Sequence, residues 1–365
     1  MLTEKKEVFY INNSHKKILP ALIFWELTQR CNLRCIHCRA SVSSSPMPGE
    51  LTEEEIKKVI DELTVFGKPI LVLTGGEPLY RNDIFDIIDY GVKKNFPVAL
   101  ATNGTLIDET MADKIVSSGV RRVSISIDGA SPETHDGFRG ITGSFQDTMK
   151  GFNNLKKRGM SIQLNSTITK HNFKEIPDIL KMAVNLGADA LHIFLLVPVG
   201  CGVELSKDQQ ITPDEYEHIL NWFYEESESS PIQLKATCAP HYFRIMAQRG
   251  KNIMKRGHGG HGMSAMTKGC LAGNGILFIS STGDIRPCGY LPVSAGNIRE
   301  KNIEDLWENA EIFRELRDPD NLKGKCLVCE FRHICMGCRA RAYGEYGDYM
   351  GEEPFCSYIP GKLRV

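Results

Sequence analysis

Three cysteines with a spacing typical of metal ligands lie near the start of the chain, in Cys31-Asn-Leu-Arg-Cys35-Ile-His-Cys38. A structural zinc site requires four ligands, and His37 is poorly placed to be the fourth because it lies between two of the cysteines. A cubane iron–sulfur cluster held by three cysteines instead leaves one iron open for a cofactor or substrate. The spacing therefore favours an iron–sulfur cluster, with a zinc site as the alternative.

A second, larger group of cysteines lies in the last quarter of the chain. Seven of the twelve cysteines belong to it: Cys270, Cys288, Cys326, Cys329, Cys335, Cys338 and Cys356. Seven thiols cannot complete two all-cysteine zinc sites of four ligands each, so iron is favoured over a zinc-ribbon-like domain here as well. Cys201 and Cys238 stand apart, and each is interpreted as a small buried apolar residue or, for Cys238 and the nearby His241, as a group facing the substrate.

The elements that must position these thiols follow an alternating pattern. Six short apolar runs predict strands, and amphipathic stretches between them predict helices, which together indicate a parallel α/β fold. Thr52 and Glu55 form a capping-box signature that opens the first helix. The predicted strands are residues 22–27, 70–74, 98–102, 122–127, 161–168 and 191–197, and the predicted helices are 53–66, 84–94, 109–118, 144–158 and 175–186.

The segments after residue 225 suggest where one domain ends and another begins. Residues 225–230 read as a solvated helix end or linker, and the glycine-rich residues 257–263 precede the second cysteine group. A hairpin is expected around Gly283, followed by a single helix over residues 303–316. The predicted organisation is an N-terminal tail (1–19), an α/β domain (20–235), a bridging segment (236–263) and a cysteine-rich domain (264–365).

The motifs at the ends of the predicted strands resemble those of the radical S-adenosylmethionine (radical SAM) enzymes, beginning with the CxxxCxxC spacing itself. That resemblance implies a partial (β/α)6 TIM-type barrel, in which SAM chelates the open iron and is cleaved to methionine and a 5′-deoxyadenosyl radical. By the same resemblance, the residue before the third cysteine packs on adenine and the carboxylate of the GGEP motif accepts from the SAM ammonium. The SAM-binding residues implied are His37, Gly75, Gly76, Glu77, Asn103, Ser126, Asp128, Arg139 and Asn165, with Arg139 as a clamp on the SAM carboxylate.

The second cysteine group resembles the SPASM extension of the same enzymes, which carries two auxiliary four-iron clusters. The resemblance implies that Cys326, Cys329, Cys335 and Cys356 hold an outer cluster and that Cys270, Cys288 and Cys338 hold an inner one, leaving one iron without a cysteine. Only two residues separate Cys335 from Cys338, where the family pattern has three. Three [4Fe–4S] clusters in all are expected.

Further motifs are similar to those of the SAM-dependent heme synthases of the siroheme-based pathway, among them Lys235-Ala-Thr-Cys-Ala-Pro-His-Tyr and Arg286-Pro-Cys-Gly-Tyr-Leu. This similarity implies that two propionates of iron-coproporphyrin III are converted to vinyl groups, with a low-potential electron donor as partner. Arg339, Arg341 and His241 are candidate substrate contacts, since buried propionates require charged partners. An enzyme acting on another tetrapyrrole, such as that of heme d1 synthesis, or on a peptide is the alternative.

The charge balance argues against polyanionic partners. The chain carries 44 basic and 45 acidic residues, a formal net charge of −1. No nucleic acid and no membrane are therefore expected among the partners, and the polar N-terminus predicts a cytoplasmic protein.

Overall fold

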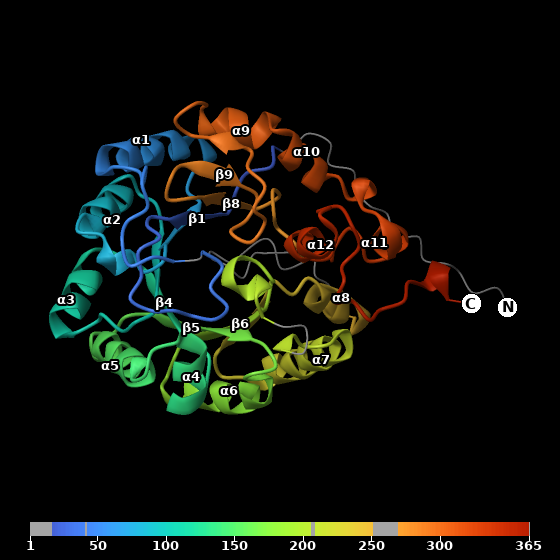
Figure 1. Ribbon diagram of the computed structural model, residues 1–365, viewed down its shortest axis with the longest axis horizontal. Coiled ribbons are helices and arrows are strands. Elements are labelled where there is room, and N and C mark those ends of the chain that lie inside the picture. Colours follow the sequence, from blue (N-terminus) through green and yellow to red (C-terminus); the bar gives the residue numbers. More distant parts are fainter. Residues whose placement is uncertain (1–16, 41, 206–208, 251–268, 365) are drawn as a thin grey trace.

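A computed structural model describes residues 17–40, 42–205, 209–250 and 269–364. One ten-stranded sheet runs through it in the order β10-β9-β8-β1-β2-β3-β4-β5-β6-β7. The strands from β1 to β7 are all parallel to one another. Figure 1 shows these strands curving around a centre, with α1 to α6 on the outside. The strands are β1 (Leu22–Glu26), β2 (Ile70–Thr74), β3 (Val98–Thr102), β4 (Arg122–Ser126), β5 (Ile162–Ile168), β6 (Ala190–Leu195), β7 (Gln233–Thr237), β8 (Ile276–Ile279), β9 (Asp284–Arg286) and β10 (Gly296–Asn297).

The helices alternate with the first seven strands and then gather in the C-terminal region, at the upper right of Figure 1. Their bounds are α1 (Glu53–Leu63), α2 (Ile84–Lys93), α3 (Glu109–Ser117), α4 (Pro132–Arg139), α5 (Ser144–Lys157), α6 (Ile176–Asn185), α7 (Pro213–Ser229), α8 (His241–Gln248), α9 (Ile303–Asn309), α10 (Glu311–Arg317), α11 (Gly324–Val328) and α12 (Arg339–Tyr346).

Local sequence explains how the first helix starts and why it packs. Thr52 Oγ1 accepts from the backbone N–H of Glu55, and the Glu55 carboxylate accepts from the N–H of Thr52, so the expected capping box is confirmed. The apolar face of α1, which includes Ile56 and Ile60, is fully buried against the sheet. The cysteine loop that lies between β1 and α1 is therefore anchored at both ends.

The C-terminal region is built onto the edge of the barrel sheet. β8 pairs with β1 in parallel, with Leu22 opposite Ile276 and Trp25 opposite Ile279, and β9 returns antiparallel to β8. The hairpin predicted around Gly283 is confirmed, and this glycine has a φ of 90°. Apolar residues of this region belong to the same buried cluster as those of the barrel, including Trp307. The cysteine-rich region thus extends the sheet.

Several sequence-based predictions need correction. The six predicted strands and the parallel α/β class are confirmed, but β7 adds a seventh parallel strand, and the helices α4, α7, α8, α11 and α12 were not predicted. The single helix expected over residues 303–316 is wrong, because Ala310 is extended (ψ 133°) and separates α9 from α10. The expected helix end at residues 225–230 is confirmed, since α7 ends at Ser229. Residues 257–263, with His258 and His261, lie outside the described residues, as does most of the predicted N-terminal tail.

Among the residues that the structure describes, no helix combines the length and apolar character needed to cross a membrane.

Candidate cofactor and cluster sites

The first cysteine group lies in the loop that follows β1, at the carboxyl ends of the parallel strands. The backbone N–H of Leu33 donates to Cys31 Sγ (3.4 Å), and the Asn103 side-chain amide lies 3.9 Å from the same sulfur. Arg139 Nη1 donates to Cys35 Sγ (3.6 Å). Donors directed at sulfur favour thiolates, and such hydrogen bonds help to set the potential of an iron–sulfur cluster.

The electrostatics of this loop fit a positively charged metal group. Burial raises the pKa of the Cys31 thiol to about 12, and it also raises the pKa of Cys35. Cys35 and Cys38 each act on Cys31 through their charge, so the three thiols are electrostatic neighbours. Half-buried thiolates that repel one another are costly without a cation, and iron supplies the missing positive charge. The donor set therefore fits the cluster that the spacing predicts.

Gly75 and Gly76 lie against the backbone that enters the cysteine loop. A Cβ on Gly75 would lie 2.6 Å from the Thr28 carbonyl oxygen, and one on Gly76 would lie 2.5 Å from that of Arg30. The Gly76 N–H donates to the Thr28 carbonyl (2.6 Å). We expected these glycines to admit a ligand, but what they admit in the structure is the chain's own backbone.

Glu77 connects the second and third strands beneath this loop. The side chain is fully buried and accepts from Thr102 Oγ1 (2.7 Å), the Asn103 N–H (2.8 Å) and the Leu79 N–H (3.2 Å). Burial raises its pKa to about 7 despite these donors. The carboxylate is thus directed at β3 and the turn after β2, which differs from the direct contact with the SAM ammonium that the sequence suggested.

Asp128 and Arg139 form an ion pair at the edge of the cysteine loop. Arg139 Nη2 lies 2.5 Å from Asp128 Oδ2, and Asp128 Oδ1 accepts from the Thr167 N–H (2.6 Å). Asp128 is fully buried and Arg139 is nearly so. The expected clamp on the SAM carboxylate is therefore already occupied by Asp128, while its other nitrogen contacts Cys35.

The remaining predicted SAM contacts line the same side of the sheet. His37 stacks on Phe138, with ring centroids 4.2 Å apart, and its Nε2 lies 3.8 Å from Asp128 Oδ2. Burial lowers the pKa of His37 well below its usual range, which keeps the imidazole neutral. Ser126 and Asn165 are opposite each other on β4 and β5, and both side chains are partly exposed. The neutral, stacked ring of His37 and the partly exposed side chains of Ser126 and Asn165 are compatible with a bound adenosine.

The cysteines of the second group lie in two separate sets, an outer one and an inner one. Besides burial, the charges of Cys356 and Cys326 raise the pKa of Cys335, and the charge of Cys326 raises that of Cys329, so these thiols lie near one another. The Glu353 N–H donates to Cys326 Sγ (3.3 Å). The four cysteines predicted to hold an outer cluster are thus brought together.

The other thiols form the inner group. Cys288 has Cys270 and Cys338 as electrostatic neighbours, as predicted, and Cys238 joins them. Among the described residues, no three His, Cys, Asp or Glu side chains converge as they do around a single metal ion. The thiols that hold a cubane lie further apart, because the irons and sulfides of the cluster separate them.

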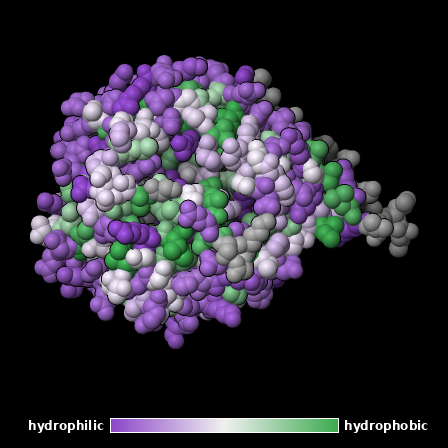
Figure 2. Space-filling model, viewed as in Figure 1, coloured by the Kyte–Doolittle hydropathy of each residue, from purple (hydrophilic) through white to green (hydrophobic). Residues whose placement is uncertain are grey.

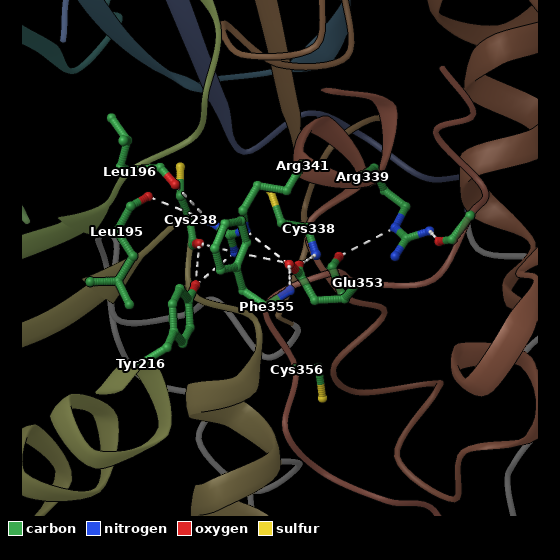
Figure 3. A network of polar contacts seen from close by, with 12 residues as sticks. Leu195, Leu196, Tyr216, Cys238, Cys338, Arg339, Arg341, Glu353, Phe355 and Cys356 are labelled. Atoms are coloured by element: carbon green, nitrogen blue, oxygen red, sulfur yellow. Dashed lines mark hydrogen bonds and ion pairs between the residues drawn. The ribbon is translucent and has the colours of Figure 1, made fainter. Parts of the chain in front are cut away.

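The arginines predicted to bind substrate have other partners (Figure 3). Both Arg339 and Arg341 are fully buried. Arg341 pairs with the buried Glu353 (2.9 Å) and donates to Tyr216 Oη (2.6 Å) and the Cys238 carbonyl (2.6 Å). Arg339 Nη1 donates to the Gly351 carbonyl (2.7 Å) and to that of Tyr349 (3.0 Å).

These contacts favour a structural role over a contact with propionates. Protein acceptors surround the Arg341 guanidinium group, and they also take Nε and Nη1 of Arg339, whereas Arg339 Nη2 is buried without a hydrogen-bond partner. His241 is buried as well and meets the Tyr216 ring edge-on at 4.8 Å. Neither of its ring nitrogens has a hydrogen-bond partner, so its contact with the substrate stays a prediction. Sequence reasoning missed Glu353, because nothing in the local sequence marks it as the partner of Arg341 twelve residues away.

The cysteine loop after β1 and the inner cysteine group lie next to each other. Arg39, which follows Cys38, pairs with Glu26 of β1 (3.0 Å) and donates to the Gly289 carbonyl (3.4 Å), next to Cys288. Tyr290 has both Cys38 and Cys288 as electrostatic neighbours. The two candidate cluster sites are therefore connected through a few residues.

Comparison with known families agrees with this geometry. Residues 25–183 match the radical SAM superfamily, and residues 270–338 match the SPASM iron-sulfur cluster-binding domain. The fold is also that of a solved structure, Streptococcus suis SuiB bound to S-adenosylmethionine, at a TM-score of 0.72 and 16% identity over 95% of this chain and 78% of that one. The chain belongs to the radical SAM enzymes with a SPASM domain, which use SAM and [4Fe–4S] clusters.

Within that superfamily, the chain is similar to proteins of one kind over nearly its whole length. It is 54% identical to the AdoMet-dependent heme synthase of Methanosarcina barkeri, covering 94% of this chain and 98% of the relative. It is 47% identical to the AdoMet-dependent heme synthase of Oleidesulfovibrio alaskensis, covering 93% and 88%. The resemblance to heme synthases is thus confirmed.

Proposed function

We propose that this enzyme oxidatively decarboxylates two propionates of iron-coproporphyrin III to vinyl groups and so forms heme b. The full-length similarity to AdoMet-dependent heme synthases supports the tetrapyrrole substrate. The reaction removes one hydrogen atom, one CO2 and one electron for each vinyl group formed. It therefore requires both a site that generates a radical and a site that accepts an electron.

The observation that carries this proposal is the adjacency of the two cysteine systems. Arg39 connects the loop that holds Cys31, Cys35 and Cys38 to Gly289, and Tyr290 lies near both Cys38 and Cys288. A substrate held at the mouth of the barrel would be close to the inner group, so the surplus electron would have a short way to travel. When bound, the catalytic cluster and SAM would supply the 5′-deoxyadenosyl radical that abstracts hydrogen from the carbon attached to the ring.

The chain's own residues would prepare this site. Cys31, Cys35 and Cys38 would hold the catalytic cluster, while Asn103 and Arg139 would direct hydrogen bonds at its sulfurs. Three [4Fe–4S] clusters in total, a low-potential electron donor and SAM contacts through His37, Ser126 and Asn165 belong to the same proposal. Gly75, Gly76, Glu77 and Asp128 would act by holding the loop.

The surface around the barrel mouth suits a large, flat, mostly apolar ligand. Figure 2 shows several hydrophobic patches near the middle of this face, separated by more hydrophilic residues, and mostly hydrophilic residues around the rim. A porphyrin would bury its ring on the former and keep its remaining propionates near the latter. Such burial would also shield a substrate radical from water.

The test is anaerobic turnover of reduced protein with SAM and iron-coproporphyrin III. Release of CO2, formation of 5′-deoxyadenosine and appearance of heme b are expected, and the Cys31→Ala, Cys35→Ala, Cys38→Ala triple variant should show none of them. If the wild-type protein cleaves SAM but releases no CO2 from this porphyrin, the substrate assignment is wrong. A different tetrapyrrole or a peptide would then be the better candidate.

A further inference from the structure

Four cysteines surround the inner cluster site, where the family pattern supplies three. Cys238 has Cys338, Cys288 and Cys270 as electrostatic neighbours. The same four side chains pack in one apolar cluster together with Val197 and Leu291. Cys238 thus lies on the site itself, although 32 residues separate it from Cys270 in the sequence.

The backbone of Cys238 is held in a conformation that a cysteine rarely adopts. Its φ is +53°, in the left-handed region that favours glycine. Two buried donors fix its carbonyl oxygen: Tyr216 Oη at 2.9 Å and Arg341 Nη2 at 2.6 Å. A strained residue persists only where its surroundings determine it, and such residues gather at functional sites. A cysteine whose only role was to fill space would not require this arrangement.

Arg341 and its partners explain how the strain is maintained. Glu353 pairs with Arg341, and its Oε2 accepts from the N–H of Cys338 (2.5 Å). One buried network therefore fixes the backbone of both Cys238 and Cys338 (Figure 3). Positioning two thiols from distant parts of the chain through shared charged partners is typical of the residues that surround a metal site.

We propose that Cys238 is the fourth protein ligand of the inner [4Fe–4S] cluster, an inference that rests on the auxiliary clusters of the proposed function. With four thiolates, every iron of this cluster is occupied, so the substrate does not bind it through iron. The inner cluster then acts in electron transfer alone. Arg341, Tyr216 and Glu353 are positioning residues for its ligands.

The experiment compares variants of the full-length chain in which Cys31, Cys35 and Cys38 are all replaced by Ala. This background removes the catalytic cluster, whose open iron would obscure the result, and should keep about eight irons in two auxiliary clusters. Cys238→Gly is the test variant, because glycine suits the left-handed backbone and folding should survive. Cys201→Ala is the matched control, a cysteine outside both groups, and Cys238→Ser retains a weaker oxygen ligand.

After mild oxidation, the background protein and Cys201→Ala should keep their iron and give no [3Fe–4S] electron paramagnetic resonance signal. Cys238→Gly should lose about one iron per chain and give that signal, or lose the inner cluster altogether with an unchanged far-ultraviolet circular dichroism spectrum. Cys238→Ser should keep its iron but alter the Mössbauer parameters of one site.

Identical iron content and spectra in Cys238→Gly and the background would overturn the proposal. Absence of auxiliary iron from the background itself would overturn it together with the auxiliary clusters. These outcomes do not depend on the porphyrin, since no substrate is present. Failure of wild-type protein to turn over iron-coproporphyrin III would therefore be recognised separately.

Discussion

Glu77 combines a strongly perturbed pKa with a structural position beside the catalytic loop. Its pKa of about 7 has burial as the main cause, and its hydrogen-bond donors only partly oppose this effect. The motif that contains it was predicted from its residues, but the direction of its side chain was not. A carboxylate next to two glycines can face a ligand or the protein interior. Here it faces the interior because donors at the end of β3 hold it, and the local sequence does not show where β3 lies.

The pH dependence of stability should report on this residue. The folded protein holds the Glu77 proton up to a higher pH than the unfolded chain does, so unfolding releases a proton between about pH 4.5 and pH 7. Stability should fall as the pH rises through that window, by roughly 3 kcal/mol at most. Glu77→Gln cannot titrate and should show a flatter profile of thermal unfolding midpoints. Equal slopes in both proteins would mean that Glu77 is ionised throughout.

The loop between β1 and α1 depends on the close approach of the turn after β2. Gly76→Ala would place a Cβ 2.5 Å from the Arg30 carbonyl oxygen, so the cysteine loop must shift. We expect this variant to lose about a third of its iron and its SAM cleavage, since only the catalytic cluster is affected. Iron analysis and 5′-deoxyadenosine production measure both.

Gly137→Ala is the control for this loop. A Cβ there would lie 3.7 Å from the nearest atoms, in the His171 ring, and α4 should accept alanine readily. Its iron content should match that of the wild-type protein. Should Gly76→Ala also keep its full iron and cleave SAM, the loop would have to be more adaptable than the contact distances indicate.

Helix α12 is anchored by a buried charge pair. Arg341→Met leaves Glu353 charged and buried without its partner, which should cost about 3–5 kcal/mol in the free energy of unfolding. Replacing Glu353 by Leu in the same chain should recover part of this loss. Arg299→Met removes an exposed pair with Glu55 and should cost under about 1 kcal/mol. Urea unfolding under anaerobic conditions distinguishes the two positions, and equal losses would show that burial of the pair is unimportant.

Among the elements, the strands of the barrel are predicted well from the sequence because they are apolar runs that are largely buried. β7 escaped prediction because Ala236 alone is buried in Gln-Leu-Lys-Ala-Thr, at the edge of the sheet. α12 begins directly after Cys338 and has little apolar periodicity. Cys238 follows no recurring spacing. The odd number of thiols in the second group was the only signal that a further ligand was needed.

Considered as a whole, the molecule is held together by one sheet that both cysteine systems share. Figure 1 shows β8 and β9 beside β1, with α9 and α10 next to them. Burial of Leu277 and Ile279 in the barrel's own cluster continues the core across this junction. The sequence pointed to a boundary between residues 225–230 and the glycine-rich residues 257–263, since composition changes there, but the pairing of Leu22 with Ile276 has no local signature.

A chain ending at Gly250 should therefore fail to fold into a stable barrel, although the three cysteines predicted to be catalytic and the predicted SAM contacts are all retained. Removing β8 exposes the hydrogen-bonding edge of β1 together with Phe24 and Trp25, and an uncovered apolar edge promotes association. We expect most of this protein to aggregate, as measured by sedimentation of freshly expressed material. Cys326→Ala or Cys356→Ala in the full chain keeps β8 and should lose only outer-cluster iron while remaining more soluble. A monomeric truncated chain that still binds the catalytic cluster would show that the edge of the sheet does not need the cysteine-rich region.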